Sequence, residues 1–244
     1  MSSPPTKSQV NKAGKTLRRH LAEAQPVLDR DRLLQAGRVV YAFREAHQSP
    51  LVSARTGLAS CIRSEQATVL LLTQRLKRLE TIFHKLTREP RMALAEMHDI
   101  GGCRAVFLHR QDVDEVAVRF SRNSLIRNGR PDRFIDYITS PRSSGYRAVH
   151  IHTRYQERFV EVQLRTVLQH AWAIIVEAVT SATSVDVKNG AGGQDVHRYL
   201  TQLGTRWAAH EAQLGPATAP ERDWMYAALE TAAKELTELV TETG

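Results

Sequence analysis

The stretch that decides the fold is FIDYITSPRSSGYRAVHIHTRYQERFVEVQLRT, residues 134–166. Apolar and polar side chains alternate in residues 147–155 and 158–166, which predicts two strands, and the short connection between them predicts an antiparallel hairpin. The apolar side chains then share one face of the sheet, while the other face collects charged and hydrogen-bonding groups, namely His150, His152, Glu161, Gln163 and Arg165. This polar face has two interpretations: it is the floor of a phosphate- and metal-binding site, or it is the water-exposed side of an antiparallel sheet.

The rest of the chain predicts an α+β fold. Residues 103–108 and 132–138 have the composition of two further strands, and helical spacing predicts helices at about 10–20, 29–47, 75–88, 112–123, 167–179, 195–212 and 221–241. Strands and helices mixed in this order, with a hairpin at the centre, indicate a mixed β-sheet with helices packed on it and additional helices at both ends.

Length and composition restrict the class of protein. The 244 residues suffice for one sizeable domain with helical additions, or for two small domains. Cys61 and Cys103 do not have the spacing of a zinc site or a disulfide framework. No segment approaches the roughly 20 apolar residues of a membrane span, and the start lacks an apolar signal core, so we expect a cytoplasmic protein with no membrane partner. A net charge of +8 favours a polyanionic partner, although an arginine-rich proteome would give the same excess.

The predicted helix 75–88 carries a basic ridge. Lys77, Thr81 and Lys85 recur every four residues opposite the apolar side of the helix, and Arg75 stands at its start. Two ammonium groups and a hydroxyl on one ridge could grip a triphosphate, with Arg75 stacking on it or forking to it. The same pattern is typical of the solvated face of a basic helix.

Two further positions are candidates for ligand contacts. Asp99 precedes the predicted strand 103–108, where a carboxylate is a natural ligand for Mg²⁺ or the cap of a turn. Tyr146 follows Gly145 in a loop, where its ring could stack on a nucleobase or plug the edge of the sheet. The sequence contains no phosphate-binding loop of the G-x-x-x-x-G-K-[ST] type and no dinucleotide-binding glycine pattern.

Taken in order, these segments resemble the synthetase domain of RelA/SpoT-type alarmone synthetases, especially the small single-domain and toxin-like members. The resemblance covers roughly residues 68–180 and rests on four ordered motifs, RLKRLETIFHK, DIGGCR, DYITSPRSSGYRAVH and VEVQLRT. It implies a nucleotidyltransferase-like mixed sheet that transfers pyrophosphate from ATP to a ribose 3′-hydroxyl and releases AMP.

The resemblance also implies which residues hold ATP. Adenine would lie between Arg75 and Arg104, while Lys77 and Lys85 would neutralise the triphosphate. Thr81 stands where the family commonly has a serine in this helix, and it keeps the hydroxyl.

A second implied group serves the metal and the acceptor. Asp99 and Glu161 would hold Mg²⁺, the implied cofactor, with Glu161 also placed to activate the attacking hydroxyl. Tyr146 would stack on the acceptor base, and His150 and Gln163 would orient the acceptor and the phosphates. Such a transfer requires positioning, metal and positive charge more than covalent catalysis.

The identity of the acceptor stays open. The family's loop commonly reads Lys-x-Asn-Gly-Tyr, and here Arg142 and Ser144 stand at its lysine and asparagine positions. Because Ser144 lacks the asparagine amide, an expected contact to the guanine edge is lost. The acceptor is therefore either GDP or GTP, giving an alarmone, or the 3′-terminal adenosine of tRNA, as in some toxin-like relatives. A basic stripe of Lys12, Lys15 and Arg19 would suit tRNA phosphates, and would equally suit a solvated helix.

We expect three segments: a helical N-terminal extension (1–66), the synthetase-like domain (67–183) and C-terminal helices (184–244). Since 244 residues leave no room for a hydrolase domain, an active enzyme of this kind would arrest growth and would require a neutralising antitoxin or a separate hydrolase. The last helix would pack on the domain, mediate a homo-oligomer or meet a partner. The alternative to an enzyme is a catalytically inactive RNA- or nucleotide-binding regulatory module of the same fold; the presence of both Asp99 and Glu161 favours the enzyme.

Overall fold

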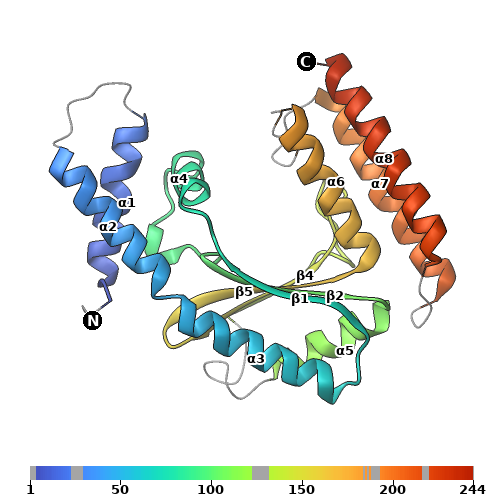
Figure 1. Cartoon of the computed structure of the whole chain (residues 1–244), viewed down its shortest axis with the longest axis horizontal. Coiled ribbons are helices and arrows are strands. Elements are labelled where there is room, and N and C mark those ends of the chain that lie inside the picture. Colours follow the sequence, from blue (N-terminus) through green and yellow to red (C-terminus); the bar gives the residue numbers. More distant parts are fainter. Residues whose placement is uncertain are drawn as a thin grey trace.

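The computed structural model describes residues 4–22, 30–122, 132–183, 185, 187, 193–215 and 220–243. Its strands are β1 (Val69–Leu76), β2 (Gly101–Phe107), β3 (Arg133–Asp136), β4 (Val149–Tyr155) and β5 (Arg158–Thr166). Its helices are α1 (Lys7–Ala22), α2 (Arg30–Glu45), α3 (Gln48–Ser64), α4 (Leu79–Arg88), the short 3₁₀ helix η1 (Leu94–Glu96), α5 (Arg110–Ser121), α6 (Val167–Thr183), α7 (Gly193–Leu214) and α8 (Arg222–Thr243). The predicted α+β class, with helices before and after a mixed sheet, is confirmed (Figure 1).

The five strands form one sheet in the order β1-β2-β5-β4-β3. β2 and β5 run parallel, and all other neighbours are antiparallel. The predicted hairpin is β4–β5, and only Gln156 and Glu157 lie between its paired ends. Both have positive φ angles, 48° and 62°, which is the backbone of a type I′ turn and matches the twist of the flanking strands. This tight turn fixes the register, and the register fixes which side chains share a face.

One face of the sheet is covered by α3 and α5, which lie together below it in Figure 1. The sheet contributes alternate apolar side chains to this core, among them Cys103, Ala105, Phe107, Val149, Ile151, Val160, Val162 and Leu164. The two helices contribute Leu51, Ala54, Leu58, Val113, Val116 and Phe120. Because side chains alternate between the two faces of each strand, one face of the sheet is apolar, and this face packs against α3 and α5.

The other face of the sheet is flanked by two groups of helices, one at each end (Figure 1). At one end α4 packs with α1, α2 and η1 around its own apolar cluster, which includes Val10, Val40, Ile82, Leu86 and Leu94. At the other end α6, α7 and α8 pack around a third cluster, which includes Trp172, Val176, Leu203, Trp207 and Leu236. The polar face of β4 and β5 thus lies between two separately packed helical groups. The last helix packs with α6 and α7, which is one of the three roles considered for it.

The prediction of one helix over residues 75–88 was wrong at its start. Residues up to Leu76 belong to β1, and the helix α4 begins only at Leu79. Leucines recur with helical spacing across this junction, but they serve two different cores. Leu72 and Leu76 pack in the sheet core, whereas Leu79 and Leu86 pack with the N-terminal helices. What looked like one apolar side of a single helix therefore consists of leucines from the edge strand β1 and leucines from the short helix α4.

The stretch between the second predicted helix and residue 75 had no clear pattern, yet it forms α3 and most of β1. α3 carries Gly57 and several small residues on its buried side, which weakens its helical periodicity. α3 packs in the sheet core, although the predicted N-terminal extension 1–66 includes it. The sequence is rich in glycine at residues 189–194, which lie largely outside the described residues. None of the described helices has the length and apolar character needed to span a membrane.

Candidate functional site

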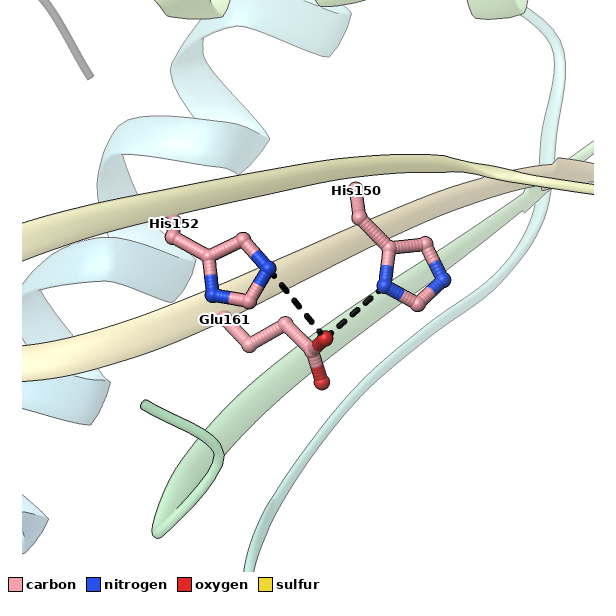
Figure 2. Close-up of side chains that lie close together, drawn as sticks. All are labelled: His150, His152 and Glu161. Atoms are coloured by element: carbon pink, nitrogen blue, oxygen red, sulfur yellow. Dashed lines mark hydrogen bonds and ion pairs between the residues drawn. The ribbon is translucent and has the colours of Figure 1, made fainter. Parts of the chain in front are cut away.

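The polar face is built around Glu161. In the register of β4 and β5, Glu161 lies opposite His152 and Gln163 lies opposite His150. His150 Nδ1 lies 2.8 Å from Glu161 Oε1, and Gln163 Nε2 donates to Glu161 Oε2 at 2.8 Å. Figure 2 shows the Glu161 carboxylate beside the rings of His150 and His152. The side chain of Glu161 is only 13% exposed. Both carboxylate oxygens are therefore held by neighbours on the sheet, which fixes the orientation of the carboxylate.

The hydrogen-bond network continues from His150 toward the loop that precedes β4. Tyr146 Oη lies 2.6 Å from His150 Nε2, and Arg165 Nη2 donates to Tyr146 Oη at 2.6 Å. Arg165 Nη2 also donates to Gln163 Oε1 at 2.9 Å. Burial raises the pKa of Tyr146, so its hydroxyl stays protonated at neutral pH. Four residues predicted for the site, Tyr146, His150, Glu161 and Gln163, thus form one connected network.

The charge of Glu161 is set by its surroundings. Burial alone would raise its pKa, but the hydrogen bond and charge of His150, together with His152 and Gln163, outweigh burial and lower the pKa to about 2. Burial lowers the pKa of His152 to about 4, against the opposing effect of Glu161. At neutral pH the site therefore holds an ionised carboxylate beside a neutral imidazole, which is a ligand set rather than a strong general base.

Asp99 lies between two lysines at the edge of the same face. Lys77 Nζ is 2.9 Å from Asp99 Oδ2, and Lys85 Nζ is 3.1 Å from Asp99 Oδ1. Burial raises the pKa of Asp99, but the two ammonium groups outweigh it and hold the pKa below its usual value. The charge of Glu161 opposes them, so the two predicted metal ligands lie close enough to influence each other. The predicted phosphate lysines and the predicted metal ligand Asp99 are brought together.

The two lysines reach Asp99 from different elements. Lys77 lies between β1 and α4, where its backbone N donates to Ile100 O at 2.8 Å and its backbone O accepts from Arg44 Nε at 2.8 Å. Lys85 extends from the last turns of α4, and Thr81 is exposed on the first turn. Of the predicted ridge, Lys77 and Lys85 therefore form a pair of cations. Lys77 is positioned by Ile100, just before β2, and by Arg44 of α2, and not by helical spacing.

Arg75 and Arg104 lie on neighbouring antiparallel strands. Arg75 is opposite Gly102, so Arg104, two residues further along β2, is its diagonal neighbour on the polar face. Such diagonal neighbours lie about 7–8 Å apart, which is within reach of long side chains. The two long side chains therefore extend from the same face of adjacent strands. Gly102, opposite Arg75, has no side chain on this face.

Two arginines on the polar face have donor groups without acceptors. Nε of Arg104, and Nε and Nη1 of Arg165, are buried and have no hydrogen-bond partner in the described part of the chain. Burial and the nearby charge of Arg165 lower the pKa of Arg104. His170 of α6 has its pKa lowered to about 4, by burial and then by these two arginines. A buried concentration of positive charge with free donors is suited to an anionic ligand such as a phosphate group.

The loop 140–147, which carries the predicted acceptor contacts, is fixed by α7. Gly145 has φ = 85°, and a Cβ atom there would lie 2.6 Å from Leu200 O. Thr201 Oγ1 donates to Ser143 O at 2.8 Å. A Cβ atom on Gly204 would lie only 2.5 Å from Gly145 O. The loop and helix therefore touch backbone to backbone, a contact that requires glycine at both positions.

Within this loop the predicted acceptor residues have different environments. Arg142 Nη2 donates to Tyr137 Oη at 3.0 Å, and the Arg142 guanidinium lies 4.6 Å from the Tyr137 ring centre and 5.6 Å from that of Tyr146. Ser144 is half-buried. Arg142 thus covers part of the ring on which an acceptor base would stack.

Sequence reasoning missed the contribution of residues outside the hairpin. His98 Nδ1 lies 3.2 Å from His152 Nδ1, and His98 stacks on Phe159 with ring centres 3.9 Å apart. His98 and His170 lie in a loop and on a helix, so strand alternation gave no signal for either. Arg165 was placed on the polar face by its alternation, but its two hydrogen bonds, to Tyr146 Oη and Gln163 Oε1, follow only from the fold.

Residues 74–180 match the model of the family described as the region found in RelA/SpoT proteins. Uncharacterized proteins of Mycobacterium bovis and Mycobacterium tuberculosis are 34% identical over 123 residues, which is 49% of this chain. The chain spans only 43% of the length of these curated relatives.

Solved structures show the same fold. The small alarmone synthetase 2 from Bacillus subtilis aligns with a TM-score of 0.58 and 19% identity, over 70% of this chain and 94% of that protein. A GTP pyrophosphokinase family protein from Streptococcus pneumoniae aligns with a TM-score of 0.55 and 23% identity, over 78% of this chain and 96% of that protein. Residues 74–180 therefore match the RelA/SpoT family region, and the chain has the fold of these solved structures, as the ordered motifs of the sequence predicted.

Proposed function

We propose that the protein is a pyrophosphokinase that transfers the β,γ-pyrophosphate of ATP to a ribose 3′-hydroxyl. The observation that carries this proposal is the placement of two ionised carboxylates: Asp99 is held by the cations of Lys77 and Lys85, and Glu161 is held in the hydrogen-bonded network of the polar face. The family match supports the same reaction class, because the solved relatives are named as alarmone synthetases and GTP pyrophosphokinases.

The ATP end of the site is formed by β1, β2 and α4. The diagonal pair Arg75 and Arg104 would hold the adenine ring between guanidinium planes. Lys77 and Lys85 would exchange part of their contact with Asp99 for triphosphate oxygens, and Thr81 would offer its hydroxyl from the same helix. Because both ammonium groups are already positioned in the free protein, little reorganisation is needed when phosphate arrives.

The implied Mg²⁺ fits the residues present. Asp99 and Glu161 are ionised, lie close enough to affect each other's charge, and each oxygen retains lone-pair capacity beyond the contacts described above. Magnesium prefers one or two carboxylates together with phosphate oxygens, and it would supply charge neutralisation on the pyrophosphoryl group. Asp99 and Glu161 are the residues that would hold it.

The residues at the acceptor end of the site would orient the attacking hydroxyl group. The ribose 3′-oxygen attacks the β-phosphorus, the bond from that phosphorus to the α,β-bridging oxygen breaks, and AMP leaves. Glu161 accepts a hydrogen bond from the attacking hydroxyl, while His150 and Gln163 keep its carboxylate in place. With a pKa of about 2, Glu161 is a weak proton acceptor, which suffices for a loose transition state in which little nucleophile activation is needed.

We propose two alternative acceptor classes for this loop, GDP or GTP and the 3′-terminal adenosine of tRNA. Tyr146 would stack on either base, with Arg142 and Ser144 beside it. The exposed stripe Lys12, Lys15 and Arg19 lies on α1, at the end of the molecule opposite α7 (Figure 1). A tRNA that used this stripe would have to cross the ATP end of the site to reach Tyr146. With either acceptor, unchecked turnover would arrest growth, so a neutralising protein or hydrolase is expected beside the enzyme.

The test supplies ATP labelled at the γ-phosphate, Mg²⁺, and GDP, GTP or deacylated tRNA in separate reactions. Glu161→Gln is the test variant, and Glu230→Gln, which alters an exposed carboxylate on α8, is the matched control. The expected result is label on one acceptor class with release of AMP, lost in Glu161→Gln and retained in Glu230→Gln. The class that receives the label identifies the acceptor.

The contrary outcome is equally specific. If the folded wild-type protein binds a non-hydrolysable ATP analogue but labels none of the acceptors, the protein is a nucleotide-binding module and the enzyme proposal is wrong. If Glu161→Gln transfers label as fast as the wild type, Glu161 has no catalytic role.

A further inference from the structure

Two imidazoles and one carboxylate converge on the polar face with a donor set unlike that proposed for magnesium. His150, His152 and Glu161 each offer one ligand atom, and the three atoms lie within 4.8 Å of one another. Figure 2 shows both rings directed at the same carboxylate. The two histidines lie on β4, and Glu161 lies on the neighbouring strand β5. His150 and His152 are two residues apart on one strand and Glu161 is paired with His152, so the sheet itself fixes this grouping.

The separations suit a small transition-metal ion. His150 Nδ1 and Glu161 Oε1 are 2.8 Å apart, and His152 Nε2 and Glu161 Oε1 are 3.7 Å apart. Around a tetrahedral zinc ion with bonds near 2.0–2.1 Å, ligand atoms lie about 3.3 Å from each other. The two observed separations bracket this value, and the ligand atoms of all three residues lie within 4.8 Å of one another, so side-chain rotations would bring the three donors to bonding distance.

The remaining ring nitrogens have the partners that metal-bound histidines usually have. If His150 binds through Nδ1, its Nε2–H donates to Tyr146 Oη, which lies 2.6 Å away. If His152 binds through Nε2, its Nδ1–H donates to His98 Nδ1, which lies 3.2 Å away. Such outer hydrogen bonds fix the tautomer and ring orientation of metal ligands. His98 is itself held by stacking on Phe159.

We propose that His150, His152 and Glu161 bind a divalent transition-metal ion, with Zn²⁺ or Co²⁺ as the probe. Imidazole nitrogen favours these ions over Mg²⁺, whereas the Asp99–Glu161 pair offers oxygen alone. Binding at this site does not depend on the proposed reaction. Its consequence does: because Glu161 and His150 belong to both sites, a transition metal here displaces them from their catalytic contacts and inhibits the transfer.

The test is direct metal binding to the full-length, metal-stripped protein in the presence of excess Mg²⁺. Co²⁺ is titrated and its visible absorption is recorded, and Zn²⁺ is then added as a competitor. We expect one Co²⁺ per chain, displaced by Zn²⁺, and a loss of affinity of about 10-fold or more in His152→Ala and His98→Ala. His84→Ala removes an exposed histidine of α4 and is the matched control, with unchanged binding.

The absence of stoichiometric Co²⁺ binding by the wild type would overturn the proposal, and so would equal binding by wild type and His152→Ala. Circular dichroism checks that each variant is folded. Should His152→Ala unfold, His152→Gln keeps the side-chain bulk and gives the same comparison. Because absorption and not turnover is measured, a protein that transfers no label can still pass this test, and an active pyrophosphokinase can still fail it.

Discussion

The two faces of the sheet come from the same strands and have opposite contents. Toward α3 and α5, Phe107, Val162 and Leu164 are fully buried in an apolar core. Toward α4 and α6, the intervening residues of the same strands include Glu161 and His150, which are also largely buried but bonded to other polar groups. An ordinary water-facing side of a sheet would expose such residues. What distinguishes a site from a wet face is therefore burial combined with mutual hydrogen bonding.

The largest expected effect breaks the apolar face. Phe107→Ala should lower the free energy of unfolding by about 3–5 kcal/mol, because it leaves a cavity in a fully buried core. Thr73→Ala, on an exposed position of β1 facing the other way, is the control and should change it by less than about 1 kcal/mol. Urea denaturation measures both, and equal effects would contradict the assignment of the faces.

The next prediction breaks the polar face. Glu161→Gln should reduce label transfer by about 100-fold or more, equivalent to roughly 3 kcal/mol of transition-state stabilisation. Its free energy of unfolding should fall less than that of Phe107→Ala, because the amide can keep one of the hydrogen bonds to His150 or Gln163. Initial rates and urea midpoints on the same preparations give the two values. A larger loss of stability than in Phe107→Ala would make Glu161 primarily a structural residue.

A third prediction compares two helical glycines. Alanine is favoured over glycine in a helix by about 1 kcal/mol. Gly37→Ala in α2 should therefore raise the free energy of unfolding by this amount, since nothing lies within 4 Å of the added methyl group. Gly204→Ala should instead lose about 1–3 kcal/mol, because its methyl group would overlap Gly145 O. Thermal unfolding of both variants measures the two changes in stability. If both variants were stabilised, the loop at Gly145 would be able to move away from α7 without loss of stability.

The smallest effect concerns pH. Burial lowers the pKa of His47, outside the site, and of His152, within it, to about 4 in each case. In the unfolded chain these imidazoles bind protons near pH 6.5. The contribution of each neutral histidine to the free energy of unfolding is therefore fully present above pH 6.5, and it declines as the pH falls toward 4. Each of the two histidines should lower the free energy of unfolding by about 1 kcal/mol when the pH is changed from 8 to 6. His47→Gln should flatten the decline measured by urea denaturation, and an unchanged pH profile would show that His47 is not buried as described.

The sequence predicted the face that holds the site better than it predicted the elements around it. Alternation in β4 and β5 is a local property, so His150, Glu161 and Gln163 could be placed together without a structure. Lys77 could not be placed correctly, because its leucine neighbours divide between two cores that are separate only in three dimensions. The salt bridges from Lys77 and Lys85 to Asp99, the His98–His152 contact and the support of α7 all join distant segments, which no local pattern encodes.

The contact of Gly145 with Gly204 has a consequence for how the protein is made. During synthesis the sheet and every predicted catalytic side chain emerge from the ribosome before α7 does. Until α7 has docked, the loop that carries Tyr146 lacks the helix backbone against which it rests. The loop that carries Tyr146 is therefore the last part of the polar face to gain its support, and under the proposed function a nascent chain would complete its ATP end before its acceptor end.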